Sequence, residues 1–169
     1  MKGFILISLL TLSITGYSQD TLFKVNHEAI TDFLVTTCEN KTQNEIYKKT
    51  IEWVSITFRN SNQVIQSKIE NEMIRFEGFT ESFAGGSLNA VYLIEISFKD
   101  GKYKFDPIKF TLTNDGIHKF EFFETFSSYF KSDGNVKERL KATVSGVESK
   151  INGLNASLKD YIIGKKSDW

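Results

Sequence analysis

Apolar residues recur at helical spacing in a first stretch that begins near residue 43. One face of such a helix carries Ile46, Thr50, Ile51, Val54 and Phe58, flanked by Tyr47 and Trp53. Thr42 followed three residues later by Glu45 fits a capping box, in which each side chain satisfies a backbone amide at the helix start. This pattern predicts a helix over about 43–59.

A second apolar stripe, near the C-terminal end, repeats every seven residues. It consists of Leu140, Val144, Val147, Ile151, Leu154, Leu158 and Tyr161. Gly146 and Gly153 interrupt the helix at one equivalent position of the repeat, and Gly164 followed by two lysines is typical of a helix end. We therefore predict a long helix over about 136–163.

The seven-residue repeat has two interpretations. It is typical of a coiled-coil dimer, but a straight helix drifts by only ~20° per heptad, which keeps the stripe within the ~100° of a core-facing surface. The preceding strands also need a cover for their aromatic side chains. We therefore favour packing within a monomer and keep dimerisation through the C-terminal helix as the alternative.

The segment between the helices alternates apolar and polar residues, as strands do. Asp100-Gly101 has the sequence of a two-residue type I′ turn, which predicts a long hairpin over 88–113 with Lys99 opposite Lys102. The apolar series changes parity, so we expect a β-bulge at Asp106-Pro107, where a missing proline N–H is tolerated. The other predicted pairs are Phe98 with Tyr103, Ile96 with Phe105 and, beyond the bulge, Ile94 with Ile108 and Tyr92 with Phe110.

Further strands are predicted on both sides of that hairpin. An early strand lies within 27–37, and its expected buried positions are Ile30, Phe33 and Val35. A second hairpin spans 64–79, and its Gly78 indicates a bend or a close backbone approach. The predicted pairs there are Ile69 with Ile74, Ser67 with Phe76 and Ile65 with Gly78. A short last strand begins near His118, and irregular structure follows it up to the turn at 132–135.

These elements predict one α+β domain in which an antiparallel sheet packs against the two helices. The length of 169 residues is typical of a single domain, and 40% apolar with 25% charged residues is ordinary for a folded globule. We assign residues 19–169 to this domain.

Residues 1–18 have the three parts of a secretory signal peptide. Lys2 supplies the positive charge, residues 4–12 the apolar run, and Ser18 the small residue before a cleavage site that makes Gln19 the first mature residue. The apolar run is about half of the ~20 residues that a membrane-spanning helix needs, so we expect no anchor after cleavage. An exported protein, periplasmic or extracellular, is therefore predicted.

Charge and cysteine content exclude several classes of protein. Lys plus Arg and Asp plus Glu number 21 each, so no overall positive field attracts nucleic acid or anionic lipid. The only cysteine, Cys38, rules out an internal disulfide and a thiolate zinc site, and it lies too far along the chain for a lipoprotein. We expect Cys38 to be half-buried and without a chemical role.

The sequence contains no catalytic, metal-binding or cofactor-binding motif. The two histidines, His27 and His118, lie far apart and lack the spacing of a metal site. A nucleophile elbow, a phosphate-binding glycine loop and an EF-hand are all missing, and the carboxylates are dispersed. We therefore predict no enzymatic activity, no metal and no cofactor, and the binding residues stay unassigned.

The fifteen phenylalanines have two interpretations. With the tyrosines they either line a pocket for a small apolar ligand or fill the core, where each ring buries roughly 150–250 Å². We favour the core. If the face around Tyr92 and Phe110 is filled, a protein is the expected partner instead.

Two signatures carry a resemblance to a known family. They are the Ile-Tyr and Trp spacing of the helix at 44–54 and the turn sequence Lys-Asp-Gly-Lys-Tyr at 99–103. Over about residues 28–163 the chain resembles uncharacterised bacterial envelope proteins, described as a domain of unknown function with a TATA-binding-protein-like fold. In that family a basic residue, often Arg, follows the turn Tyr, and here it is Lys104.

The resemblance implies a curved antiparallel sheet of about five to six strands that grips two helices, a TATA-binding-protein-like or helix-grip-like fold. It implies no DNA binding, because function resides in sites and the fold name describes shape. No catalytic residues are known for the family, so none is carried over. The aromatic segment 117–135 departs from the family pattern and is a candidate variable insertion.

Three functions follow as hypotheses. The favoured one is a non-catalytic binding or accessory protein of the bacterial cell envelope, whose partner is an unknown protein or a small apolar ligand. The alternative is a structural or assembly protein that dimerises through the C-terminal helix, where charged residues at Val147 and Leu154 would dissociate the pair. The third is an enzyme with an unrecognised site.

Overall fold

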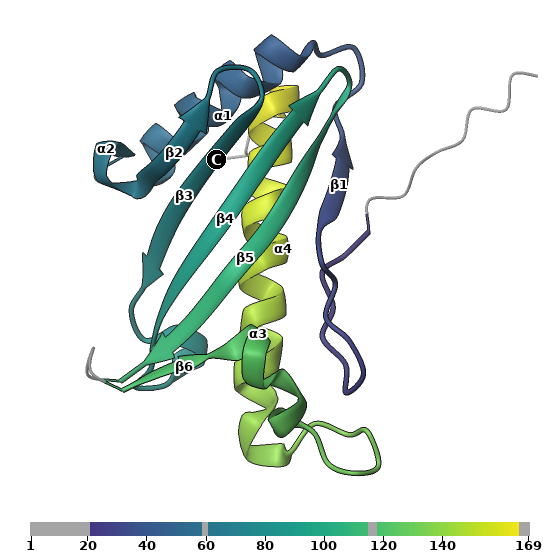
Figure 1. Ribbon diagram of the computed structural model, residues 1–169, viewed down its shortest axis with the longest axis vertical. Coiled ribbons are helices and arrows are strands. Elements are labelled where there is room, and N and C mark those ends of the chain that lie inside the picture. The colour runs from purple at the N-terminus through teal and green to yellow at the C-terminus, as the bar shows by residue number, and fades with distance from the viewer. Residues whose placement is uncertain (1–20, 59–60, 115–117, 166–169) are drawn as a thin grey trace, which may run out of the picture.

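The computed structural model describes residues 21–58, 61–114 and 118–165 and shows an α+β fold (Figure 1). The strands are β1 (Leu34–Thr37), β2 (Ile65–Ile69), β3 (Met73–Thr80), β4 (Asn89–Lys99), β5 (Lys102–Thr113) and β6 (Lys119–Glu121). The helices are α1 (Gln43–Thr57), α2 (Ser61–Val64), α3 (Phe122–Thr125) and α4 (Lys141–Ile163). Short 3₁₀ turns occupy Phe83–Gly85, Phe126–Tyr129 and Glu138–Leu140. The signal peptide predicted at 1–18 lies outside the described residues.

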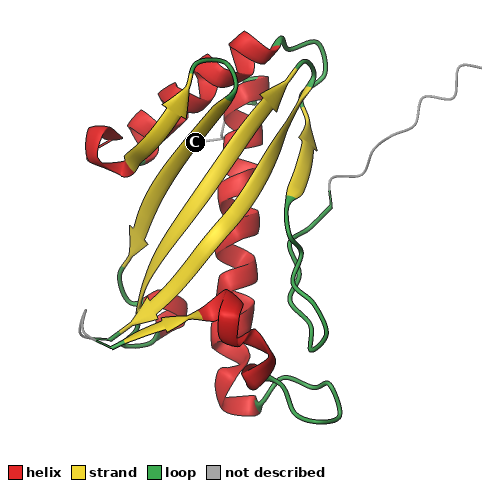
Figure 2. Cartoon of the chain, viewed as in Figure 1, coloured by secondary structure: helices red, strands yellow, loops and turns green. Residues whose placement is uncertain are grey.

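The sheet is antiparallel and has the strand order β1-β5-β4-β3-β2, with β6 as a second neighbour of β5. Figure 2 shows the two long helices, α1 and α4, behind one face of the curved sheet. Among the described residues, no helix lies over the opposite face, which we call the outer face. This arrangement confirms the predicted curved sheet of five to six strands packed on two helices.

Helix α1 begins at its predicted position because the capping box forms. The Glu45 N–H donates to Thr42 Oγ1 over 3.2 Å, and the Thr42 N–H donates to Glu45 Oε2 over 2.8 Å. The buried face consists of Ile46, Tyr47, Thr50, Trp53 and Val54. Tyr47 and Trp53 were expected to flank the apolar stripe, and this detail was wrong, since both lie in the core.

Helix α4 begins at Lys141, a few residues after the predicted start, and Gly164 ends it with φ +70° as predicted. Its buried residues are Val144, Val147, Ile151, Asn155, Leu158 and Ile162, which follow the 3.6-residue period of a straight helix. Leu154 and Tyr161, which continue the seven-residue repeat, are only half-buried. The stripe thus packs inside the chain, as the favoured interpretation requires.

The β4–β5 hairpin reverses at Asp100-Gly101, as predicted, but the predicted turn type was wrong. A type I′ turn needs a positive φ at both central residues, and only Gly101, with φ +74°, has one. Phe98 pairs with Tyr103, Ile96 with Phe105 and Tyr92 with Phe110, which confirms three predicted pairs.

The β-bulge lies one residue later than expected. Ile94 pairs with Pro107 rather than with Ile108, and Ile108 is the extra residue, 42% exposed. The prediction was wrong because Pro107 continues the inward series of Tyr103 and Phe105, so the parity changes only after it.

The β2–β3 hairpin forms, but its predicted register was wrong. Ile69 pairs with Met73 and Lys68 with Ile74. The reason is the loop: Asn71 adopts φ +61°, and the chain reverses over three residues, Glu70–Glu72.

The predicted early strand is present as β1, but its inward positions were wrong. Leu34 and Thr36 are buried, whereas Phe33 and Val35 are exposed and Ile30 is half-buried. Leu34 pairs with the inward-facing Phe105, which fixes this parity. The sequence pattern missed it because Thr36 is polar, and its hydroxyl bonds to a buried amide on α4.

The aromatic segment 117–135, as far as it is described, contains a short strand and two helical turns, close to the predicted short strand and irregular structure. Its Phe122 and Phe130 are buried, so the segment contributes to the core. Gly134, with φ +80°, makes the predicted turn between Phe130 and Val136. Its assignment as a variable insertion stays a prediction.

Candidate functional site

The inner face of the sheet is filled by its own aromatic side chains. Tyr92 is 3% exposed and Phe110 is fully buried, and their rings stack with centroids 6.0 Å apart. The Phe110 ring also contacts the rings of Phe83 and Phe122, whose centroids lie 5.3 Å and 6.3 Å from its own. The core interpretation of these rings is confirmed. The rings of Tyr92 and Phe110 are therefore part of the core and not the wall of a ligand pocket.

The outer face is the alternative place for a site, because no helix covers it among the residues described (Figure 2). It mixes charged and apolar side chains from three strands. The outward positions are Met73, Arg75, Glu77 and Phe79 on β3, Val91, Leu93, Glu95 and Ser97 on β4, and Lys102, Lys104, Asp106 and Lys109 on β5.

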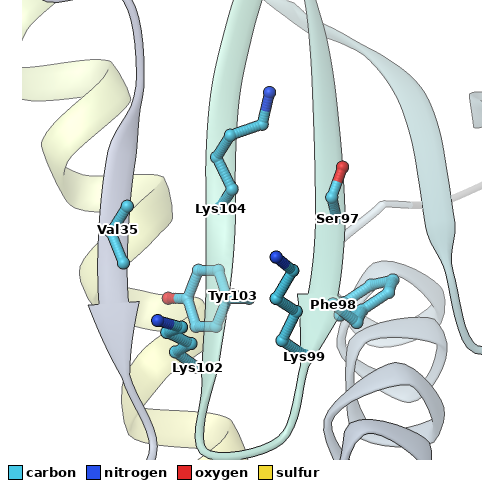
Figure 3. A pocket seen from close by; sticks show the side chains of 7 residues that line it. All are labelled: Val35, Ser97, Phe98, Lys99, Lys102, Tyr103 and Lys104. Atoms are coloured by element: carbon cyan, nitrogen blue, oxygen red, sulfur yellow. The ribbon is translucent and has the colours of Figure 1, made fainter.

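A groove of about 350 Å³ lies on this face, at the end where β4 and β5 reverse. Its lining residues are Val35, Ser97, Phe98, Lys99, Lys102, Tyr103 and Lys104. Figure 3 shows Lys104 beside Ser97 on the neighbouring strand, Lys99 and Lys102 nearer the turn, and the Phe98 ring pointing toward a helix behind the sheet. The groove therefore has an apolar wall at Val35 and a border of lysines.

Two of these lysines lack a neutralising partner. Lys99 and Lys102 are directly paired across the two strands, and neither forms an ion pair with any described residue. Like charges placed opposite each other destabilise a sheet. The pair therefore has an electrostatic cost that nothing in the described chain offsets.

The other cations at the outward positions of β3 and β5 are each paired with a carboxylate, whereas Lys119 on β6 forms no ion pair with a described residue. Arg75 lies 2.6 Å from Glu95, Lys104 Nζ 2.8 Å from Asp106 Oδ2, and Lys109 3.1 Å from Glu121. Lys104 also lies over the Phe33 ring, 5.2 Å from its centroid. Against this background Lys99 and Lys102 are two unpaired cations that lie directly opposite each other.

The acidic turn residue between the two lysines is engaged elsewhere. Asp100 Oδ1 accepts a 2.8 Å hydrogen bond from the N–H of Gln43, in the first turn of α1. The Gly101 N–H donates to the Lys41 carbonyl over 2.8 Å, and the Cys38 N–H donates to the Gly101 carbonyl over 2.7 Å. These bonds hold the end of the hairpin against the start of α1 and the segment before it.

A second recess, of about 660 Å³, lies at the edge of β5 between β1 and β6. Ile108, Phe123 and Phe126 supply its apolar part, and Asp32 and Asp106 its charge. Asp106 is already paired with Lys104. The recess is therefore the weaker candidate, because Asp32 alone of its charged residues lacks an ion pair with a described residue, whereas the groove has two such lysines.

The residues considered for catalysis or metal binding are not gathered into a site. His27 lies 3.4 Å from Glu28 and next to Gly134, whereas His118 is exposed just before β6. Within the described ranges, no three side chains of the types His, Cys, Asp and Glu come together as they would around a metal ion. Cys38 is fully buried and not half-buried as expected, because it lies under the hairpin turn.

The carboxylates with shifted pKa values have structural causes. Backbone and side-chain hydrogen bonds from Thr42 lower the pKa of Glu45. A hydrogen bond from Lys49 lowers the pKa of Glu52, and one from Lys141 lowers the pKa of Glu138. A backbone hydrogen bond from Asn135 lowers the pKa of Asp133 in the turn at 132–135. These four carboxylates all lie outside the groove.

The sequence already contained the signal for the groove. The turn sequence Lys-Asp-Gly-Lys places Lys99 opposite Lys102 in any two-residue hairpin, and that pairing was predicted. Sequence alone did not show that both lysines lack partners, because the contact between Asp100 and α1 joins residues 57 positions apart.

None of the helices in the described parts of the chain is both long and apolar enough to span a membrane.

Comparison with known proteins gives the fold. No protein-family model and no curated protein sequence matches the chain. A DUF4468 family protein from Bacteroides ovatus matches with a TM-score of 0.69 at 12% sequence identity, over 82% of this chain and 88% of that one. A TBP-like protein from Parabacteroides distasonis matches with a TM-score of 0.62 at 13% identity, over 77% of this chain and 90% of that one. At these identities the likeness concerns the fold and not the function, and it confirms the TATA-binding-protein-like resemblance that the helix and turn signatures predicted.

Proposed function

We propose that the chain is an exported, non-catalytic binding protein of the bacterial cell envelope, which holds a partner against the outer face of its sheet. The observation that carries this proposal is the uncompensated Lys99–Lys102 pair at the end of a hairpin that is hydrogen-bonded to α1 and the segment before it. A sheet face without a helical cover, bordered by unpaired charge, is a surface that a binding partner can complete.

Export is supported by the leader pattern at 1–18. The test is the N-terminus of the protein after expression of the full chain in a bacterium with signal peptidase. We expect a periplasmic or secreted product whose mass and N-terminal sequence begin at Gln19. The matched control is Ser18→Leu, which places a large residue before the cleavage site and should leave the precursor uncleaved. An intact chain in the cytoplasm would contradict the proposal.

The binding role is tested by a photo-crosslinking amino acid placed at Val35, which lines the groove, and at Lys48, an exposed position on α1. In the producing cells, we expect a crosslinked adduct from position 35 alone. We expect the adduct to disappear when Lys99→Gln and Lys102→Gln are added. Equal adducts at both positions, or an adduct that survives the two substitutions, would contradict a role for this groove.

The alternative, dimerisation through α4, gains no support from the packing. The residues that would form the seam, Val147 among them, are buried against the sheet of the same chain, and Leu154 is half-buried there. We therefore propose a monomer, and sedimentation of the purified chain at micromolar concentration tests it.

A further inference from the structure

We propose that the groove binds an extended acidic segment of a partner protein, whose carboxylates pair with Lys99, Lys102 and Lys104. This inference rests on the proposed binding function and names the chemistry of its partner. Three observations carry it: the spacing of the lysines, the concentration of unpaired positive charge at the groove, and the hydrogen bonds that hold the turn between the lysines.

The spacing matches an extended peptide. Lys102 and Lys104 are two residues apart on one strand, so their backbone positions are separated by roughly 6.6 Å. An extended segment with acidic residues at alternate positions presents its carboxylates with the same repeat, on one face. Lys99, directly across from Lys102, adds a third ammonium group beside this row.

Among the described residues, the unpaired positive charge of this face is concentrated at the groove, since Lys119 lies alone on β6 at the other end of the sheet. This distribution disfavours two broader classes of partner. A membrane surface or a nucleic acid backbone needs an extended basic face. Here the same sheet face carries Glu77, Glu95, Asp106 and Glu121, and the chain has 21 basic and 21 acidic residues in total. A short run of carboxylates is the partner that fits such a local positive patch.

Lys104 is already paired with Asp106, so its contribution to binding differs from that of Lys99 and Lys102. The Lys104 ammonium group can leave Asp106 for a carboxylate of the partner, or it can bond to both carboxylates at once, because it has three N–H donors. Lys99 and Lys102 gain a new ion pair outright. We therefore expect these two to contribute most of the affinity.

The groove also offers contacts that suit a peptide. The Ser97 hydroxyl has no hydrogen-bond partner among the described side chains and backbone, and it lines the groove beside the lysines (Figure 3). Val35 supplies an exposed apolar wall. Because one hydrogen bond ties the turn to Gln43 in α1 and two tie it to Cys38 and Lys41 before that helix, we expect binding to require little ordering of the protein.

The test uses the folded chain, purified from the compartment in which it accumulates and labelled with nitrogen-15. The probes are a pentapeptide of sequence Glu-Thr-Glu-Thr-Glu with blocked ends, its counterpart with Gln in place of Glu, inorganic phosphate, and vesicles containing phosphatidylglycerol. We expect the acidic peptide to shift the amide signals of residues 97–104. The binding should weaken with added salt, as screening of ion pairs requires.

Two variants complete the design. Lys99→Gln with Lys102→Gln should weaken binding of the acidic peptide by about tenfold, since two exposed ion pairs are lost. Lys48→Gln removes one exposed, unpaired lysine from α1 and should leave the affinity unchanged. Thermal unfolding of each variant verifies that it is folded.

Several results would overturn the proposal. They are an absence of shifts with the acidic peptide, an equal response to the Gln peptide, an unchanged affinity in the double variant, and tighter binding of phosphate or of vesicles than of the peptide. A groove crosslink that persists when the peptide fails would reject the acidic partner and leave the binding role standing. An uncleaved leader would reject export and leave peptide binding to stand.

Discussion

Gly78 lies directly opposite Tyr92 in the β3–β4 ladder, and the Tyr92 ring occupies the space that a side chain at position 78 would fill. A Cβ atom added to Gly78 would lie 2.1 Å from Tyr92 Cε2. The ring is held there by its stacking on Phe110. The glycine thus allows a large ring to lie flat across the neighbouring strand, which is the close approach that its place in a strand predicted.

Gly78→Ala should therefore destabilise the protein. The methyl group would displace Tyr92 from a packed core, and overpacking of this kind costs about 1–3 kcal/mol. Urea unfolding followed by tryptophan fluorescence measures the change in the free energy of unfolding. Gly153→Ala is the matched control, because a Cβ there meets nothing within 4 Å and the position lies inside α4. It should stabilise the protein by up to roughly 1 kcal/mol. Equal effects at the two positions would contradict this account of Gly78.

Asn155 on α4 connects two strands through buried hydrogen bonds. Tyr103 Oη donates to Asn155 Oδ1 over 2.9 Å, and Asn155 Nδ2 donates to Thr36 Oγ1 over 3.0 Å. Asn155→Ala leaves a buried threonine hydroxyl without this amide, and we expect a loss of about 1–3 kcal/mol in the free energy of unfolding.

A double-mutant cycle with Tyr103→Phe tests whether the amide acts through these partners. Tyr103→Phe alone should cost less, because the Asn155 amide keeps its bond to Thr36. In the Asn155→Ala background Tyr103→Phe should cost still less, and the difference measures the coupling. Additive effects of the two substitutions on the free energy of unfolding, measured by chemical denaturation, would show that Asn155 and Tyr103 are not coupled.

The same residue explains where prediction from sequence succeeded and where it failed. The long helix was predictable because apolar residues marked it over many turns. A repeat of seven selected Leu154 and Tyr161 from neighbouring positions, whereas the straight helix buries Asn155 and Ile162. Asn155 was missed because its burial depends on hydrogen bonds to Thr36 on β1 and Tyr103 on β5, which lie far from it in the sequence.

Strand register and the choice of inward positions were also predictable where nearby residues determine them, and not where distant residues do. The β4–β5 hairpin was predictable because Asp100-Gly101 fixes its pairing locally. The β2–β3 register depends on the left-handed backbone of Asn71, and β1 takes its parity from Phe105, far along the chain. The lysine groove combines both kinds of information: the opposed lysines are local, and the engagement of Asp100 by α1 is not.

The capping box of α1 should give the protein a measurable dependence on acid. Hydrogen bonds from Thr42 lower the pKa of Glu45 in the folded state. Its ionised form therefore stabilises the fold above the ordinary glutamate pKa of roughly 4.3, and this contribution is lost as the pH falls through the lowered value.

Glu45→Gln is the variant that isolates this effect, because it keeps a side-chain oxygen as acceptor and does not titrate. Thermal unfolding midpoints measured from neutral pH to about pH 3 should fall less steeply for Glu45→Gln than for the wild type. The other carboxylates with lowered pKa values, Glu52, Asp133 and Glu138, are common to both proteins and cancel in the comparison. Parallel curves would contradict the assignment.

Repulsion between Lys99 and Lys102 should lower the free energy of unfolding of the protein. Lys99→Glu turns two opposed like charges into an opposite-charge pair, which should raise the free energy of unfolding by about 0.2–1 kcal/mol. The gain should shrink in high salt, because screening weakens exposed charge pairs. Lys48→Glu makes the same change of charge on α1 without an opposed lysine, and it should not stabilise the protein in the same way.

If Lys99→Glu stabilises the chain and also abolishes the groove crosslink from position 35, the two lysines are kept for binding. If it leaves the stability unchanged at low salt, the two ammonium groups do not repel each other as the register implies.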